Sequence, residues 1–250
     1  MFWFHPSDVC DLTLDLNTVN RHLSLSEENR KVTWRREKQP YPDHPERFKD
    51  WEQVLCREGL TGRCYWEVEC SGRTFIGVTY KGISRRGWVD DCWLGHNDKS
   101  WSLECTDNSY SVWHNNTPTT IDVPSSSSHR VGVYLDWPAG TLSFYRASSD
   151  TLTHLYTFTS TFTEPLYPGF RVDVDSSVSL KSHTGDTHTT WRHTHTHTHT
   201  QDTHIHAGDT HTHTHTHTQD THIHAGDTQT HTHWTHTLKH THTGLTHTLD

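Results

Sequence analysis

Short segments in which apolar and polar residues alternate recur between residues 64 and 172, and this pattern predicts β-strands. In the clearest segment, 64–70, the even-numbered residues are Cys, Trp, Val and Cys and fall on one face. Tyr65, Glu67 and Glu69 fall on the opposite face. Because successive side chains of a strand point to opposite faces, we expect this strand to bury one face and expose the other.

Turn residues separate these segments and predict how consecutive strands are joined. Ser71-Gly72 predicts a two-residue hairpin, with residues 73–80 returning as the partner of the preceding strand. Trp137-Pro138-Ala139-Gly140 predicts a second hairpin, because Pro presets the backbone at the second turn position. This second turn joins the strands that we expect at 131–136 and 141–146.

Several short antiparallel strands at close spacing predict an all-β fold, an antiparallel β-sandwich. Further strands are expected near 99–105, 109–114, 151–158 and 165–172, and no 11-residue window has the period of an amphipathic helix. One helical turn is expected at 43–49, after a Pro-rich stretch. The predicted core residues are Trp66, Val68, Trp101, Leu103, Leu135 and Phe144.

The composition changes abruptly after residue 182. Residues 1–182 hold 9 of the 11 Trp and all of the Tyr and Phe, whereas 44 of the 68 residues from 183 to 250 are His or Thr. Eighteen letters, residues 193–210, are repeated unchanged at 211–228. Since this segment has almost nothing apolar to offset its conformational entropy, we expect a disordered low-complexity tail. The predicted organisation is an extension at 1–7, a globular body at 8–182 and the tail at 183–250.

Two explanations of the tail stay open. An alternating A-C dinucleotide tract encodes Thr-His, so the tail is interpreted first as translated repeat DNA without a selected structure. The rival is metal binding, because histidines at positions i and i+2 of an extended chain share a face and suit Zn²⁺, Cu²⁺ or Ni²⁺. We expect such binding of divalent ions to be adventitious. No cofactor and no metal site is predicted in the body.

Charge and hydropathy exclude two classes of partner. The whole chain has a formal net charge of −9 and no long basic run, so it lacks the electrostatic footprint of a nucleic-acid-binding protein. No apolar run approaches the ~20 residues that a bilayer-spanning helix needs. The first six residues have no basic region and make a poor signal peptide, so we expect a cytoplasmic location.

The six cysteines contain no CxxC pair, so the usual spacing of a structural zinc site is missing. We expect buried or half-buried free thiols, as in a cytosolic fold. A secreted form with disulfides is the alternative.

Seven segments in order resemble the PRY-SPRY module, also called the B30.2 domain. They are residues 12–26, Arg47-Phe48 with Trp51 and Val54-Leu55, Tyr65–Glu69, Gly77-Val78, Trp101–Cys105, 131–145 and 165–170. The resemblance covers residues 8 to about 181 and is strongest to the modules of bony fish. In bony fish the module forms the C-terminal part of NOD-like receptors, of tripartite-motif ubiquitin ligases and of a stonefish-type (stonustoxin-like) pore-forming toxin. Leu16 stands where the family motif has Pro.

The resemblance implies a bent, concanavalin A-like sandwich of two antiparallel sheets that binds a protein partner through loops at one end. By alignment with a tripartite-motif relative, the implied contact positions are Lys81, Glu104, Thr106 and Arg171. We expect Glu104 and Thr106 to face outward, because they alternate with Leu103 and Cys105. Trp88, Trp93 and Trp113 lie near loops and are further candidates, since an exposed Trp is a typical binding hot spot.

No catalytic residue is predicted. Gly95–Ser100 contains a Ser, a His and an Asp, but the members of a triad normally come from separate segments, so we interpret it as a polar loop. Asp90-Asp91 is interpreted as a solvated loop. The expected function is protein binding in an innate-immune or ubiquitin-ligase context, with a secreted toxin-like or lectin-like protein as the first alternative and a His-rich metal-binding protein as the second.

Overall fold

The computed structural model describes residues 6–122, 129–148 and 151–181, together with the backbone of residues 197–199, 214–222 and 231–239. The chain divides into two compact units, Met1–Gly185 and Asp186–Asp250.

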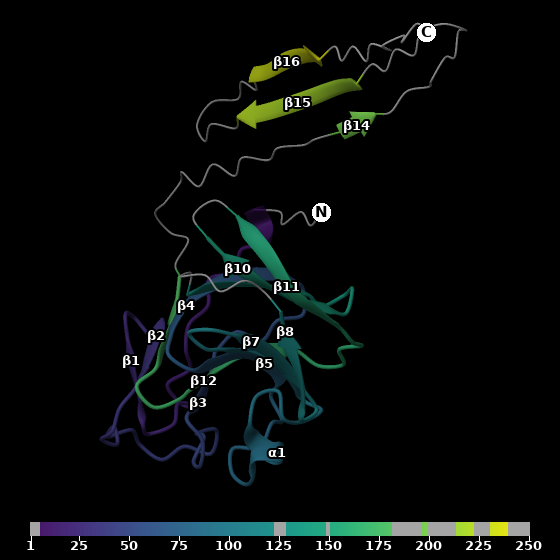
Figure 1. Cartoon of the computed structure of the whole chain (residues 1–250). Coiled ribbons are helices and arrows are strands. Elements are labelled where there is room, and N and C mark those ends of the chain that lie inside the picture. The colour runs from purple at the N-terminus through teal and green to yellow at the C-terminus, as the bar shows by residue number, and fades with distance from the viewer. Residues whose placement is uncertain are drawn as a thin grey trace, which may run out of the picture. The chain divides into compact units, whose positions relative to one another are not determined.

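The first unit is a sandwich of two antiparallel sheets, as the alternating pattern and the family resemblance predicted (Figure 1). The larger sheet has seven strands in the order β1-β2-β13-β4-β9-β10-β11. Their bounds are β1 Leu23–Ser26, β2 Lys31–Trp34, β13 Ser177–Leu180, β4 Arg63–Ser71, β9 Arg130–Asp136, β10 Thr141–Ala147 and β11 Leu152–Thr159.

The second sheet has six strands in the order β3-β12-β5-β6-β7-β8. Their bounds are β3 Gln53–Leu55, β12 Leu166–Val172, β5 Thr74–Tyr80, β6 Ser100–Cys105, β7 Tyr110–His114 and β8 Thr117–Ile121. Two short helices accompany the sheets, the 3-10 helix η1 Pro6–Asp8 and α1 Val89–Cys92. In Figure 1, α1 lies on the side of the six-stranded sheet that faces away from the seven-stranded sheet.

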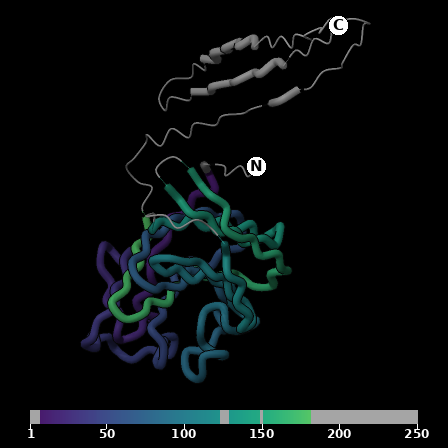
Figure 2. The backbone as a smooth tube through the Cα atoms, in the orientation of Figure 1, coloured from purple at the N-terminus to yellow at the C-terminus, as the bar shows by residue number. Residues whose placement is uncertain are grey.

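The core fills the space between the sheets with one set of alternate side chains from each strand. Because β4 and β9 pair in register, Trp66 lies opposite Val133 and Cys64 opposite Leu135. All six residues predicted for the core are buried in one cluster, which also takes side chains from β1, β2 and β13. The tube in Figure 2 shows how early and late parts of the chain lie side by side in the body.

The hairpin predicted at Ser71-Gly72 is wrong. β4 pairs with β13 and β9, whereas β5 pairs with β12 and β6, so the chain crosses here from one sheet to the other. Gly72 has φ of +72°, and a Cβ on it would lie 2.4 Å from the Ser176 hydroxyl oxygen. A tight turn between alternating segments has the same local pattern whether the chain folds back or changes sheet, so the sequence did not distinguish them.

The expectation of one exposed face on β4 holds for Glu69, which is exposed, but it is wrong for the other two residues of that face. Tyr65 and Glu67 are buried, although they point away from the core. The Tyr65 hydroxyl donates to Glu67 Oε1 at 2.8 Å, and Arg130 forms an ion pair with Glu67. The N-terminal segment lies alongside, since Val9 bridges to Tyr65. A segment more than fifty residues away in the sequence thus buries a face that the local pattern marks as polar.

The free-thiol prediction is wrong for two cysteines. Cys10 and Cys64 form a disulfide, which ties the N-terminal segment to β4. The other four are free and buried: Cys56, Cys70, Cys92 and Cys105.

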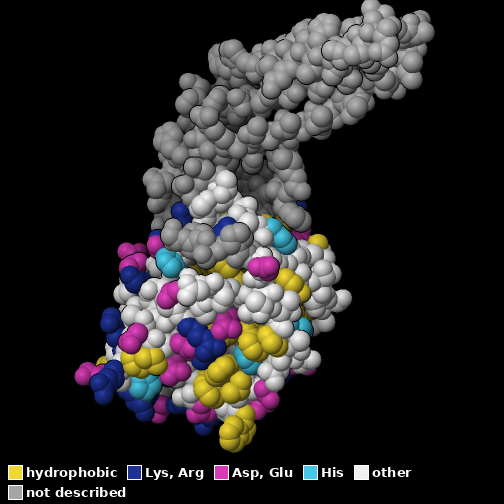
Figure 3. Space-filling view, in the orientation of Figure 1, with side chains coloured by type: hydrophobic (Ala, Val, Ile, Leu, Met, Phe, Trp, Pro, Cys, Tyr) yellow, Lys and Arg dark blue, Asp and Glu magenta, His cyan; other side chains and the backbone are white. Residues whose placement is uncertain are grey.

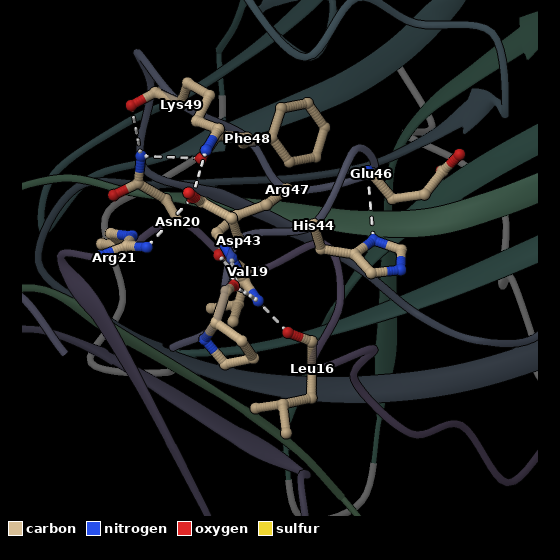
Figure 4. A network of polar contacts seen from close by, with 11 residues as sticks. Leu16, Val19, Asn20, Arg21, Asp43, His44, Glu46, Arg47, Phe48 and Lys49 are labelled. Atoms are coloured by element: carbon tan, nitrogen blue, oxygen red, sulfur yellow. Dashed lines mark hydrogen bonds and ion pairs between the residues drawn. The ribbon is translucent and has the colours of Figure 1, made fainter. Parts of the chain in front are cut away.

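The buried Arg47 organises the N-terminal part of the body (Figure 4). Its guanidinium donates to the carbonyl oxygens of Leu16 at 2.9 Å, Val19 at 2.7 Å and Pro42 at 2.9 Å. Three carbonyls therefore satisfy a cation that burial alone would destabilise, and burial lowers its pKa.

No helix forms at 43–49, contrary to the expectation; the Arg47 amide donates to the His44 carbonyl in an isolated turn. Pro42 and Pro45 explain this, because each restrains the residue before it away from helical geometry.

The described part of the second unit is a sheet of three strands, β14 His197–His199, β15 Thr214–His222 and β16 His231–Lys239. Much of residues 183–250 lies outside the described residues, so the disordered tail and its adventitious metal binding stay predictions. Neither helix in the described part of the chain is long and apolar enough to span a membrane.

Candidate partner-binding surface

The outer face of the six-stranded sheet carries a row of side chains that the register brings together. Arg171 on β12 lies opposite Phe75 on β5, and Phe75 lies opposite Glu104 on β6. Two of the predicted binding positions, Arg171 and Glu104, are therefore separated by one strand although 66 residues lie between them in the sequence.

Glu104 points away from the core, as expected, but it is only 9% exposed. Its carboxylate accepts from Arg73 Nε at 2.7 Å and from Trp113 Nε1 at 2.8 Å. Asp173 links the two arginines, since it pairs with Arg73 at 3.3 Å and also with Arg171. Two cations and two carboxylates thus neutralise one another, and Glu104 helps to hold this face together.

Arg171 is 5% exposed and stacks on an aromatic wall. Its guanidinium carbon lies 3.7 Å from the centre of the Trp93 ring and 4.7 Å from that of Phe75. Burial lowers its pKa, and Asp173 opposes this effect. Nε and Nη1 have no hydrogen-bond partner among the residues that the structure describes, and the cation–π contacts supply the compensation for their burial.

The loop between β5 and β6 is bound firmly to this face. Gln53 accepts from the Leu94 amide at 2.9 Å and donates to the Cys92 carbonyl at 2.7 Å. Trp51 Nε1 donates to the Gly87 carbonyl at 3.0 Å. The segment around α1 therefore has hydrogen bonds at both ends to the strand β3 region, which limits its freedom in the unbound protein.

His96 fills the space between the loop and the sheet. Its ring stacks on Trp113 with centroids 4.4 Å apart and meets the edge of Trp93 at 4.9 Å. It is 6% exposed, and burial lowers its pKa below 6.5. The imidazole therefore acts here as a neutral aromatic spacer.

The remaining predicted positions lie apart from this row. Lys81 is exposed at the other end of β5, six residues from Phe75, which is about 20 Å along a strand. Its ammonium lies 5.8 Å from the centre of the Tyr167 ring. Thr106 is half-buried just after β6, in a turn with Ser109. Trp88 is 83% exposed, immediately before α1.

Figure 3 shows hydrophobic, acidic and basic side chains side by side on the lower part of the body, in the region where α1 lies in Figure 1. Sequence reasoning did not assign four residues to the support of this surface: Trp51, Arg73, Phe75 and His96. Only the alternation of Phe75 with Ile76 in β5 could have placed one of them on the outer face.

The Gly95–Ser100 segment does not form a triad. The Ser100 hydroxyl donates to Asn97 Oδ1 at 2.8 Å and accepts from the Gly95 amide at 2.7 Å, while His96 Nδ1 lies 3.4 Å from the Leu94 carbonyl oxygen. Asp90 and Asp91 are exposed, as expected, but they lie in α1 and not in a loop. Within the described ranges, no cluster of three or more His, Cys, Asp or Glu side chains could hold a metal ion.

Comparison with known proteins agrees with this architecture. A family model described as "SPRY-associated domain" matches residues 12–60, and one described as "SPRY domain" matches residues 63–187. The chain is 48% identical over 164 residues to stonustoxin subunit beta of Synanceia horrida, covering 65% of this chain and 23% of the toxin subunit. It is 41% identical over 167 residues to mouse (Mus musculus) tripartite motif-containing protein 16, covering 64% and 29% of the two chains.

Among solved structures, the TRIM65 PSpry domain superposes with a TM-score of 0.64 at 30% identity, over 70% of this chain and 92% of that domain. Two packed antiparallel sheets define the class of β-sandwich domains, and within that class the chain belongs to the PRY-SPRY family. The SPRY domain is a protein-interaction module in tripartite-motif proteins. The chain spans about a quarter of the length of the curated relatives that it matches.

Proposed function

We propose that the body binds a protein partner through the loop between β5 and β6 and the adjoining outer face of the six-stranded sheet. The observation that carries this proposal is Trp88, a large aromatic side chain that is 83% exposed on a segment fixed to the sheet. The stack of Trp93 on Arg171 and the hydrogen bonds of Gln53 order that segment before binding. A pre-ordered aromatic offers a large contact area at a small entropic cost.

The test uses the full chain and a partner captured with it. Trp88→Ala is expected to weaken binding by about 30-fold or more, the effect of a hot spot. Leu16→Ala is the matched control, because Leu16 is another exposed apolar side chain, 40% exposed and in a different segment. Undiminished binding by Trp88→Ala would place the interface elsewhere.

A second test concerns Lys81, a charged residue at the start of the loop between β5 and β6. Lys81→Glu is expected to weaken binding to an acidic partner and to reduce its dependence on salt, because the exposed ammonium acts through long-range complementarity. Arg171 and Glu104 are unsuitable for charge reversal, since both are buried in ion pairs and reversal would break the fold. Equal affinity and equal salt dependence of Lys81→Glu and the wild type would exclude Lys81 from the interface.

The finer proposal is a role in innate immunity or ubiquitin ligation in the cytoplasm, supported by the similarity to tripartite motif-containing protein 16. The second candidate is an exported, toxin-like protein. The Cys10–Cys64 disulfide favours it, because disulfides persist in oxidising compartments, and so does the similarity to stonustoxin subunit beta. Rapid alkylation of the native protein in its own tissue separates the two: free thiols at both positions would favour the cytoplasmic role, and an intact Cys10–Cys64 disulfide would favour export.

Under this proposal the body catalyses no reaction and binds neither nucleic acid nor membrane. Purified residues 1–182 are expected to hydrolyse generic ester and peptide substrates no faster than background. Turnover that His96→Ala abolishes would overturn the binding-module proposal.

A further inference from the structure

The turn between β7 and β8 begins the sequence Asn115-Asn116-Thr117. An Asn followed two residues later by Thr, with any residue except Pro between them, is the acceptor sequence for N-linked glycosylation. The chain has seven asparagines, and the other six lack this pattern. Asn116 is one of these six, because Pro118 stands where the acceptor sequence requires Ser or Thr. The sequence of the chain therefore contains a single acceptor, at Asn115.

The acceptor lies at the tip of a hairpin, and its three residues are exposed. His114 pairs with Thr117 at the ends of the two strands, so Asn115 and Asn116 form a two-residue turn. Both have positive φ, +49° and +58°, which Asn adopts more readily than most residues. Turn formation explains the two asparagines, but it does not require a hydroxyl on Thr117, which lies beyond the turn in β8.

The Asn115 side chain is free to be modified, because backbone groups hold the turn. The Asn115 amide donates to the Asn97 carbonyl at 3.1 Å, and the Asn116 amide donates to the Gly95 carbonyl at 3.3 Å. Among the residues that the structure describes, none forms a hydrogen bond with the side-chain amide of Asn115. The Thr117 hydroxyl donates to the Asn115 carbonyl at 3.3 Å, so the two residues that define the acceptor lie side by side.

We propose that the native protein carries an N-linked glycan on Asn115. A second observation, independent of the acceptor sequence, points to the same compartment: the Cys10–Cys64 disulfide. Structural disulfides and N-linked glycans are both typical of proteins that pass through the secretory route. The inference rests on export, the second candidate function above, and does not depend on the partner-binding proposal.

The modification transfers an oligosaccharide from a lipid pyrophosphate carrier, in a reaction that an oligosaccharyltransferase catalyses. The side-chain nitrogen of Asn115 attacks the anomeric carbon of the first sugar. A C–N bond forms, and the bond from that carbon to the pyrophosphate oxygen breaks. The lipid pyrophosphate leaves with the bonding electrons, and the proton lost by the nitrogen passes to a base of the transferase.

The glycan stands beside the candidate partner-binding surface. The turn that carries it is hydrogen-bonded to Gly95 and Asn97, which end the loop that also carries Trp88. In the described part of the chain, β8 is the last strand of the six-stranded sheet. A bulky, solvated glycan next to the first residue of β8 therefore hinders strand addition at this edge and limits the approach of a partner at the Asn97 end of the loop.

The first test examines the full chain isolated from its own tissue. N-glycosidase F releases the glycan and converts the asparagine that carried it to aspartate, so digestion in heavy-oxygen water labels the site for peptide mass spectrometry. We expect the intact chain to lose mass on digestion and the label to appear at Asn115. An Asn115 peptide that is unmodified before digestion would overturn the proposal.

The disulfide in the same sample separates two kinds of failure. An unmodified Asn115 in a chain that keeps the Cys10–Cys64 disulfide contradicts the glycosylation site and leaves export standing. An unmodified Asn115 together with free thiols at both cysteines counts against both. Partner binding is tested separately by Trp88→Ala and depends on neither result.

Matched variants of the acceptor identify the glycan with this sequence. In cells that express the full chain behind a secretory signal, Thr117→Ser should keep the glycan and Thr117→Ala should lose it. Both should keep the melting temperature of the wild type, because Thr117 is exposed. Asn115→Asp should also lose the glycan, whereas Asn116→Gly should retain it, since Asn-Gly preserves the turn and the acceptor. A glycan on Thr117→Ala, or none on the wild type, would overturn the proposal.

Discussion

His96 belongs to a segment whose composition suggests a catalytic site, but its ring serves to pack the loop against the sheet. It lies between Trp93, Trp113 and Phe75, and its burial disfavours the protonated ring. Arg171, Asp90 and Glu104 also act on it, with the arginine opposing protonation and the carboxylates favouring it. The balance keeps the ring neutral, so pH should act on the stability of the body through this residue.

The pH dependence of stability has a definite sign. Because the pKa of His96 is lower in the folded state than the unfolded value of 6.5, the unfolded state binds the proton more readily. The free energy of unfolding is therefore expected to be level above about pH 6.5 and to fall as the pH drops below it. Denaturant unfolding of wild type and His96→Gln between pH 8 and pH 5 measures this contribution. Parallel curves for the two proteins would contradict it.

Two tryptophans should differ sharply in their effect on stability. Trp66→Ala is expected to cost about 3–5 kcal/mol, because it leaves a large cavity between the sheets. Trp88→Ala should change the free energy of unfolding by less than about 0.5 kcal/mol, since that side chain is exposed. Urea unfolding of both variants measures the contrast, and a small effect at Trp66 would mean that the register of β4 is wrong.

At the scale of elements, two turns that contain glycine differ in the connection they make: one joins strands of different sheets and the other joins neighbouring strands of one sheet. Gly72 lies where the chain crosses between the sheets, whereas Gly140 closes the β9–β10 hairpin that the sequence predicted. The hairpin formed as expected because Pro138 presets the turn and both flanking strands alternate in the same sheet. The choice at Gly72 depended on β12 and β13, which pair with β5 and β4 from a hundred residues away.

Gly140→Ala should weaken the hairpin. Gly140 has φ of +71°, and a Cβ would lie 2.1 Å from the Ser160 carbonyl oxygen, which belongs to the backbone and cannot rotate away. We expect a loss of about 2 kcal/mol or more in the free energy of unfolding. Gly82→Ala is the control, since no atom of the described part of the chain lies within 4 Å of the Cβ it would carry. Equal stability of the two variants, measured by thermal melts, would refute the conformational argument.

At the scale of the whole molecule, the body and the tail should be separable. A chain that ends at Ser182 keeps every strand of the sandwich, including the Lys181 amide that donates to the Glu67 carbonyl. Its melting temperature is expected to match that of the full chain within about 1 °C, because residues 183–250 have little apolar surface to pack on the body. A loss of several degrees on truncation would show that the tail stabilises the sandwich.

The candidate surface was only partly predictable. The family resemblance pointed to Glu104 and Arg171, and the structure places both in one register row. Their burial was not predictable, because it depends on Trp93 and Trp113, which come from a loop and a neighbouring strand. Trp88 and Trp93 are the same residue type in the same loop, so the sequence does not distinguish them. The attachment of this loop to β3 leaves Trp88 exposed and stacks Trp93 on Arg171.

The sequence by itself determined the class of fold, the positions of eight predicted strands and the six core residues. Alternation of apolar and polar residues is a local property, so a strand with one apolar face can be recognised from its own residues without knowing which strand it pairs with. The tertiary structure alone decided which sheet each strand joins, the burial of Tyr65 and Glu67, and the meeting of Cys10 with Cys64. These depend on contacts between segments far apart in the chain, which no local pattern records.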